Sequence, residues 1–334
     1  MRTYHYQNIK NVFLVTISIF LLTILTSIHL AHAAANINQD NTEQSLNKTD
    51  DGLSNKEAAD KNNTNSDGKI DTATKSNKVD PPVSQTKQQK DDLQHYSTKG
   101  QVKPLLAGPD EYITLVQKYT SANSKGVVIL LPEWQQGATN PKAINFLQNT
   151  LPSQGWNTIA IQPENKPEDF PSAALTTEDR IKENDLILSE YKRKLDVLFT
   201  AIMNTTKEYP GIVVVIAQGN NSALLVDNFS QEDSQRPNAL ILLSSYRSSN
   251  DELIDSDNEK FAQQLAVSEL PVLDLYLKHD NSLVINKAPQ RKVMASQEVK
   301  TYYRQRQLNN TITGYYPEKE LLRQINSWLK AIGW

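Results

Sequence analysis

The sequence contains no cysteine, few aromatic residues and only five histidines, and each shortage excludes a class of chemistry. Without cysteine there is no disulfide, no thiol nucleophile and no thiolate metal site. The formal charge of -3 at pH 7 gives no electrostatic reason to bind a polyanion, so we expect no nucleic-acid partner. His279 is the one histidine after residue 103, which argues against the usual zinc sites. No Walker or dinucleotide-binding pattern is present, so we expect neither a metal nor a cofactor.

The N-terminus has the pattern of an export signal. Arg2 and Lys10 precede or flank a mostly apolar stretch from 12 to 28, and Ala31-His32-Ala33 then supplies the small residues that a signal peptidase requires. Residues 1–33 are therefore predicted to be a signal peptide, which implies a periplasmic or secreted protein. The alternative is an uncleaved inner-membrane anchor over residues 12–28, because a stretch of this length nearly spans a bilayer. Membrane contact is expected only through this segment.

A polar, low-complexity segment follows. Residues 34–103 are rich in Asn, Asp, Lys, Ser, Thr and Gln, and their large apolar residues are isolated. Such a segment cannot bury enough surface to offset its chain entropy, which predicts a disordered tether. The r.m.s. reach of a flexible chain of this length is roughly 45 Å. The simplest interpretation is a solvated spacer.

From residue 104 to residue 334 short apolar runs alternate with amphipathic stretches. This pattern predicts an α/β domain with a mostly parallel central sheet and helices on both faces. The long helix expected over 178–206 has a buried stripe made by Ile181, Leu188, Tyr191, Leu195, Leu198 and Ile202. The expected strands are 126–131, 156–161, 212–217, 238–243, 272–277 and 307–313, and the other expected helices are 141–150, 222–229, 261–267, 287–304 and 318–332.

The order of these elements is similar to that of the α/β-hydrolase fold, and five short motifs sharpen the resemblance. Together they resemble an uncharacterised family of exported proteobacterial proteins, domain of unknown function 3530, over about residues 105–334. The resemblance implies an α/β-hydrolase-like fold and an envelope location, and it implies no known substrate. The motifs are Leu131-Pro132-Glu133-Trp134, Leu151-Pro152-Ser153-Gln154-Gly155-Trp156, Leu270-Pro271-Val272-Leu273-Asp274-Leu275-Tyr276, Tyr303-Arg304-Gln305 and Ser327-Trp328-Leu329.

The turn that would carry a hydrolase nucleophile lacks one. An α/β-hydrolase places its serine on a sharp turn between a strand and a helix, in a G-x-S-x-G motif. The corresponding turn here is Ala217-Gln218-Gly219-Asn220-Asn221, so the nucleophile position is Gly219, which has no side chain. We interpret Gly219 as a structural glycine in a tight turn with positive φ.

The catalytic base is also missing from its expected place. The loop before the closing helix, residues 314–317, contains no histidine. A non-standard constellation of Ser222, His279 and Asp280 remains as an alternative, which would make the protein an active hydrolase of esters, peptides or glycans. The simpler interpretations are that Ser222 gives polarity to the start of a helix and that Asp280 is a turn residue.

Polar side chains at one edge of the expected sheet suggest a binding site. Trp134, Gln135 and Gln136 follow one strand, and Gln218 and Asn220 follow another, at the edge where open α/β sheets bind ligands. Uncharged amides beside an aromatic ring suit sugars or peptide groups. We therefore favour a non-catalytic pseudoenzyme of the cell envelope that binds an envelope partner or a small polar ligand, or that acts as an assembly component on its tether.

Overall fold

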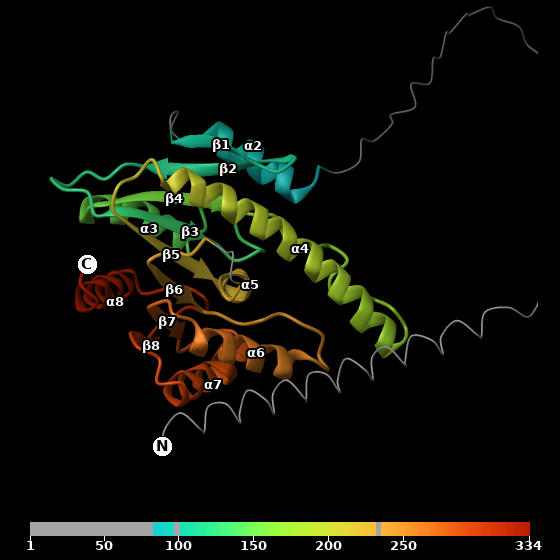
Figure 1. Cartoon of the computed structure of the whole chain (residues 1–334). Coiled ribbons are helices and arrows are strands. Elements are labelled where there is room, and N and C mark those ends of the chain that lie inside the picture. The colour runs from blue at the N-terminus through green and yellow to red at the C-terminus, as the bar shows by residue number, and fades with distance from the viewer. Residues whose placement is uncertain (1–82, 97–100, 232–234) are drawn as a thin grey trace, which may run out of the picture. The chain divides into compact units, whose positions relative to one another are not determined.

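A computed structural model describes residues 83–96, 101–231 and 235–334 of the chain (Figure 1). The expected signal segment and residues 34–82 of the expected tether lie outside the described residues. Among the described residues, no helix has both the length and the apolar character needed to cross a membrane.

The described strands form one sheet in the order β1-β2-β4-β3-β5-β6-β7-β8. The β1–β2 and β2–β4 pairs are antiparallel, and every other pair is parallel. The predicted fold class, an α/β domain with a mostly parallel sheet, is thereby confirmed. The strands are β1 (Val102–Ala107), β2 (Asp110–Gln117), β3 (Gly126–Leu131), β4 (Trp156–Gln162), β5 (Ile212–Gln218), β6 (Ala239–Leu243), β7 (Val272–Leu277) and β8 (Tyr303–Leu308).

Successive side chains along the inner strands point to opposite faces of the sheet, so the core is divided into two clusters, one on each face. In β3, Val127, Ile129 and Leu131 belong to one hydrophobic cluster, and Val128 and Leu130 belong to the other. Helices α4 (Thr177–Thr206), α5 (Gly219–Phe229) and α6 (Ile254–Val267) cover the first face, and α7 (Ser282–Gln297) lies beside α6 (Figure 1). Helices α2 (Gln85–Tyr96), α3 (Ile144–Thr150) and α8 (Glu318–Ala331) contribute to the cluster on the second face, and a 3₁₀ turn, η1 (Leu151–Gln154), leads into β4.

The long helix α4 follows its predicted pattern closely. Its expected stripe is buried except at Ile181, which is half-buried near the N-terminal end. Thr176 caps the helix, because its side chain accepts a hydrogen bond from the backbone N–H of Asp179. The predicted start at residue 178 therefore differs from the observed one by a single residue.

The folded domain begins earlier than residue 104, so the predicted end of the tether is wrong. Helix α2 and the first residues of β1 lie within the segment expected to be disordered, and β2 was not predicted at all. Leu93 explains the error, because it is 6% exposed and joins the core of the second face. A single apolar residue in a polar segment gives little sequence signal, although its tertiary contacts hold the helix.

The C-terminal boundaries also differ from the prediction. Helix α7 ends at Gln297 instead of continuing to residue 304, and β8 is Tyr303–Leu308 instead of 307–313. The intervening turn places Val299 and Tyr302 at φ values of 49° and 59°. Left-handed backbone at two non-glycine residues is uncommon, so side-chain periodicity alone could not place this turn.

Helix α2 should contribute measurably to the stability of the domain. We expect Leu93→Ala to lower the free energy of unfolding by about 2 kcal/mol or more, because it removes buried methyl groups from the core. Leu106→Ala in β1 is the matched control, since Leu106 is 74% exposed, and it should change the value by less than about 0.5 kcal/mol. Urea denaturation of both variants measures the difference, and equal small effects would show that α2 does not pack on the domain.

Candidate functional site

A cavity of about 320 Å³ lies at the carboxyl ends of the inner strands. It is the position at which open α/β sheets bind ligands. Its lining is mostly polar and comes from the loops that follow β3, β5, β6, β7 and β8. The lining residues are Glu133, Gln135, Gln136, Lys142, Gln218, Gly219, Ser244, Tyr246, Asp280, Asn281, Val284, Thr313 and Gly314.

The turn between β5 and α5 has the geometry of a nucleophile elbow without the nucleophile. Strand β5 ends at Gln218, and α5 begins directly at Gly219, which has a φ of +61°. This left-handed conformation favours glycine, which confirms the predicted positive φ at this position. A Cβ atom at residue 219 would lie 1.2 Å from Oε2 of Glu133, so another residue already occupies the space of a nucleophile side chain.

The Glu133 carboxyl also takes the backbone donor that a hydrolase would use for catalysis. Its Oε2 atom accepts a hydrogen bond of 2.6 Å from the N–H of Asn220, the residue after the nucleophile position. In α/β-hydrolases this N–H forms part of the oxyanion hole. Glu133 therefore occupies the space of a side chain at residue 219 and accepts the N–H of residue 220.

Burial favours the neutral form of this carboxyl. Desolvation raises the pKa of Glu133 to about 8, against the lowering effects of backbone hydrogen bonds from Asn220 and Trp134, the charge of Lys142 and the hydroxyl of Tyr246. Glu133 is only 6% exposed, and its Oε1 atom is buried without a hydrogen bond of normal geometry among the described residues. A neutral carboxyl avoids the cost of an uncompensated buried charge beside the helix.

Asp280 and Ser244 form a second polar group on the opposite wall. The Ser244 hydroxyl donates to Asp280 Oδ2 at 2.5 Å, and the backbone N–H of Leu277 donates to the same oxygen at 2.9 Å. Ser244 also shares a hydrogen bond of 2.6 Å with the hydroxyl of Tyr316. Tyr316 lies in the loop where the fold would place its catalytic histidine. Burial raises the pKa of the Tyr316 hydroxyl well above the ordinary tyrosine value, which disfavours its ionised form.

The structure does not bring Ser222, His279 and Asp280 together as a catalytic constellation. Ser222 is completely buried, and its hydroxyl bonds to the carbonyl of Gly219 and to Ser245 Oγ, at 2.6 Å for the latter. His279 is exposed, and the hydrogen bonds recorded for it involve its backbone. Within the part of the chain that the structure describes, no hydrogen bond links any two of these side chains.

Two of the residues predicted to bind ligand lie in the core instead. Trp134 is 2% exposed and packs against Phe170 and Tyr191, with ring centroids 5.6 Å and 5.4 Å away. Asn220 is fully buried, and its Oδ1 atom accepts a hydrogen bond from the N–H of Ser248. Their positions after strand ends suggested the binding edge, but their side chains point away from it and into packing contacts.

The other predicted binding residues do line the cavity. Gln135, Gln136 and Gln218 are part of its wall. Asn140 joins two of them, because its amide donates to Gln136 Oε1 and to Gln218 Oε1, the latter at 3.3 Å. The sequence reasoning missed Glu133 as a site residue, although a carboxylate immediately after a buried strand at the binding edge was a usable signal.

The steric competition between Glu133 and residue 219 is directly testable. We expect Gly219→Ala to destabilise the domain by more than about 2 kcal/mol, because the left-handed backbone alone costs about 1–2 kcal/mol and the new Cβ meets Oε2. Adding Glu133→Ala to the Gly219→Ala variant should recover the part of the lost stability that comes from the steric clash. A double-mutant cycle measured by chemical denaturation should therefore show favourable coupling, and simple additivity would contradict the close approach.

The protonation of Glu133 should appear in the pH dependence of stability. The folded pKa of about 8 exceeds the ordinary value of 4.5, so the folded state keeps a proton that the unfolded state loses between these values. The free energy of unfolding should therefore fall as pH rises from about 4.5 to about 8. Glu133→Gln removes this titration while its amide carbonyl can still accept from Asn220.

The difference in unfolding free energy between Glu133→Gln and the parent chain should grow with pH across this window, by an amount on the order of a few kcal/mol. Urea denaturation at pH values from 5 to 9 measures it. Parallel stability curves for the two proteins would rule out a protonated Glu133.

The chain is similar to several solved structures at low sequence identity. TT1662 from Thermus thermophilus aligns at 12% identity over 68% of this chain and 98% of that protein, with a TM-score of 0.46. A cold-adapted esterase from an Arctic intertidal metagenomic library aligns at 12% identity over 68% and 90% of the two chains, with a TM-score of 0.46. An alpha-beta serine hydrolase homologue from Coxiella burnetii aligns at 9% identity over 71% and 100%, with a TM-score of 0.42.

The family comparison covers most of the chain. No curated protein matches the chain. The profile described as "Protein of unknown function (DUF3530)" matches residues 16–197 and 189–331. The chain therefore belongs to the DUF3530 family.

Proposed function

We propose that this protein is a non-catalytic binding protein whose cavity at the sheet edge takes a small, uncharged, polar ligand. The observation that carries the proposal is the position of Glu133. Its carboxyl lies where a hydrolase nucleophile would lie and accepts the N–H that would stabilise an oxyanion.

Acyl transfer needs a nucleophile, a base and donors for the oxyanion, and a different residue stands in each place here. Gly219 has no side chain, the loop of residues 314–317 contains no histidine, and Glu133 accepts the N–H of Asn220 that would serve as an oxyanion donor. Ser222 is completely buried and therefore inaccessible to a substrate. The arrangement supports binding without covalent chemistry.

The composition of the cavity wall supports a neutral ligand rich in hydroxyl or amide groups. The wall combines the amides of Gln135, Gln136, Gln218 and Asn281, which both donate and accept hydrogen bonds. With Glu133 protonated, the remaining charges are one cation, Lys142, and one anion, Asp280. Balanced charge and many amides match a sugar-like ligand better than an ion.

The sequence also supports a proposal about where the protein is located. The signal-like residues 1–33 and the polar segment after them support export to the periplasm or beyond, with the domain carried on a spacer. Retention by residues 12–28 as an inner-membrane anchor is the alternative. In either arrangement we propose that the domain contributes recognition and not catalysis.

Reactivity and binding can be tested on the same purified full-length chain. We expect no labelling by a fluorophosphonate probe and no turnover of activated esters, because the structure offers no activated serine. Labelling that disappears in Ser222→Ala or Ser244→Ala would contradict the proposal and identify the nucleophile.

Binding of neutral monosaccharides, measured by saturation-transfer NMR and calorimetry, should depend on the cavity wall. Gln218→Ala should weaken it about 3- to 10-fold, the effect of one net hydrogen bond. Gln297→Ala is the matched control, because Gln297 is exposed at the opposite end of α7 from the cavity, and it should leave the affinity unchanged. Equal affinities for all three proteins would remove the cavity as the binding site.

A further inference from the structure

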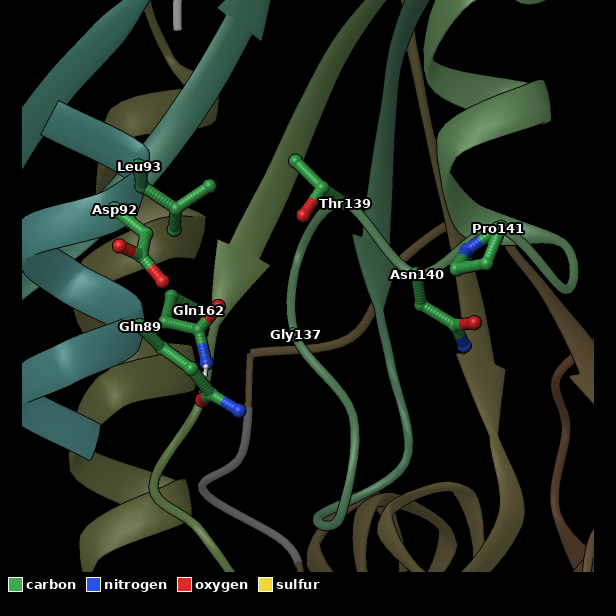
Figure 2. A pocket seen from close by; sticks show the side chains of 8 residues that line it. All are labelled: Gln89, Asp92, Leu93, Gly137, Thr139, Asn140, Pro141 and Gln162. Carbon is green, nitrogen blue, oxygen red and sulfur yellow. Dashed lines mark hydrogen bonds between the residues drawn. The ribbon is translucent and has the colours of Figure 1, made fainter. Parts of the chain in front are cut away.

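A second cavity, of about 470 Å³, is lined by the eight residues that Figure 2 shows. Helix α2 contributes Gln89, Asp92 and Leu93 to it, and the loop after β3 contributes the facing wall. Gln162, at the end of β4, holds the two sides together. Its Nε2 atom donates to Gln89 Oε1 at 2.8 Å, and its Oε1 atom accepts from the N–H of Ala138 at 3.0 Å.

Asn140 connects the two cavities through its hydrogen bonds. It lines the second cavity, and its amide donates to Gln136 and Gln218 in the wall of the first. Its Oδ1 atom accepts the N–H of Lys142 at 2.9 Å, which fixes the loop between the cavities. Asn140 and Gln218 are 7% and 5% exposed. The Asn140 side chain between the two cavities is therefore buried and fixed by its hydrogen bonds.

The second cavity continues the chemistry of the first. Its lining consists of amides and a threonine hydroxyl with one carboxylate, Asp92, and with Leu93, Gly137 and Pro141 as the less polar part. No cation is among the residues that line it. This wall has no cation to pair with an anionic ligand. Its amide and hydroxyl groups can both donate hydrogen bonds to a neutral ligand and accept hydrogen bonds from it.

The position of the cavities disfavours an extended peptide. Peptides commonly bind by adding a strand to an exposed sheet edge. Both cavities lie at the ends of inner strands, and β4, β3 and β5 are each paired on both sides. No backbone ladder is available here, so recognition must come from side chains, which suits a molecule that carries hydroxyl groups along its length.

We propose that the two cavities are adjacent subsites of one groove that binds an uncharged oligosaccharide of two or more units across Asn140. The inference rests on the proposed function of the first cavity and extends it to the class and length of the ligand. Gln89, Asp92 and Thr139 recognise the unit in the second subsite.

The test is a length series of neutral oligosaccharides. Calorimetry with gluco- and chito-oligosaccharides of one to five units, on the full-length chain, should show affinity rising at least 10-fold from one unit to the longer members in one of the series. Gln89→Ala should reduce the affinity for the longer members about 3- to 10-fold and leave the affinity for the single unit unchanged.

Gln88→Ala is the matched control, because Gln88 is the neighbouring exposed amide of α2, and it should affect no ligand. Thr139→Val on the facing wall provides a second variant that does not depend on the folding of α2, and it should show the same selective loss.

The outcomes separate this inference from the function on which it rests. Binding of single sugars without any gain in longer members overturns the two-subsite groove and leaves the first cavity as a small-ligand site. Preferential binding of neutral extended peptides overturns the saccharide assignment. Failure of every sugar and oligosaccharide to bind overturns both.

Discussion

The carboxyl group of Glu133 is held against the first turn of α5, and most properties of the site follow from that contact. It accepts the N–H of Asn220 and approaches the α-carbon of Gly219 so closely that no side chain fits there. Burial favours the neutral form of the carboxyl, so the helix start is satisfied without introducing a charge into the core. The turn between β5 and α5 is therefore closed by a carboxyl group of the same chain.

A buried ion pair supports the opposite wall of the cavity. Arg291 and Asp274 are 1% and 0% exposed, and Arg291 Nε lies 2.8 Å from Asp274 Oδ2. Arg291 also donates to the carbonyl of Ser245 at 2.9 Å, next to Ser244 with its φ of 49°. A buried pair is not by itself strong support for stability, but this one fixes the unusual backbone that directs Ser244 toward Asp280.

The sequence predicted the elements whose residues are mostly buried and missed those that depend on a few distant contacts. The apolar run of β3 and the stripe of α4 carry strong periodic signals, and both were predicted almost to the residue. Helix α2 has little signal of its own, because one leucine and a few polar contacts hold it. At the site, Gly219 could be predicted from the elbow pattern. The role of Glu133 could not, because it depends on an approach between residues 86 positions apart in the chain.

The close approach of Glu133 to Gly219 also limits how such a domain can evolve. A single change to serine at position 219 meets the carboxyl and damages the fold, and a single loss of the carboxyl leaves a hole with no nucleophile in it. Substitutions at the two positions are therefore expected to be epistatic, because a side chain at residue 219 fits only after the carboxyl at residue 133 is lost.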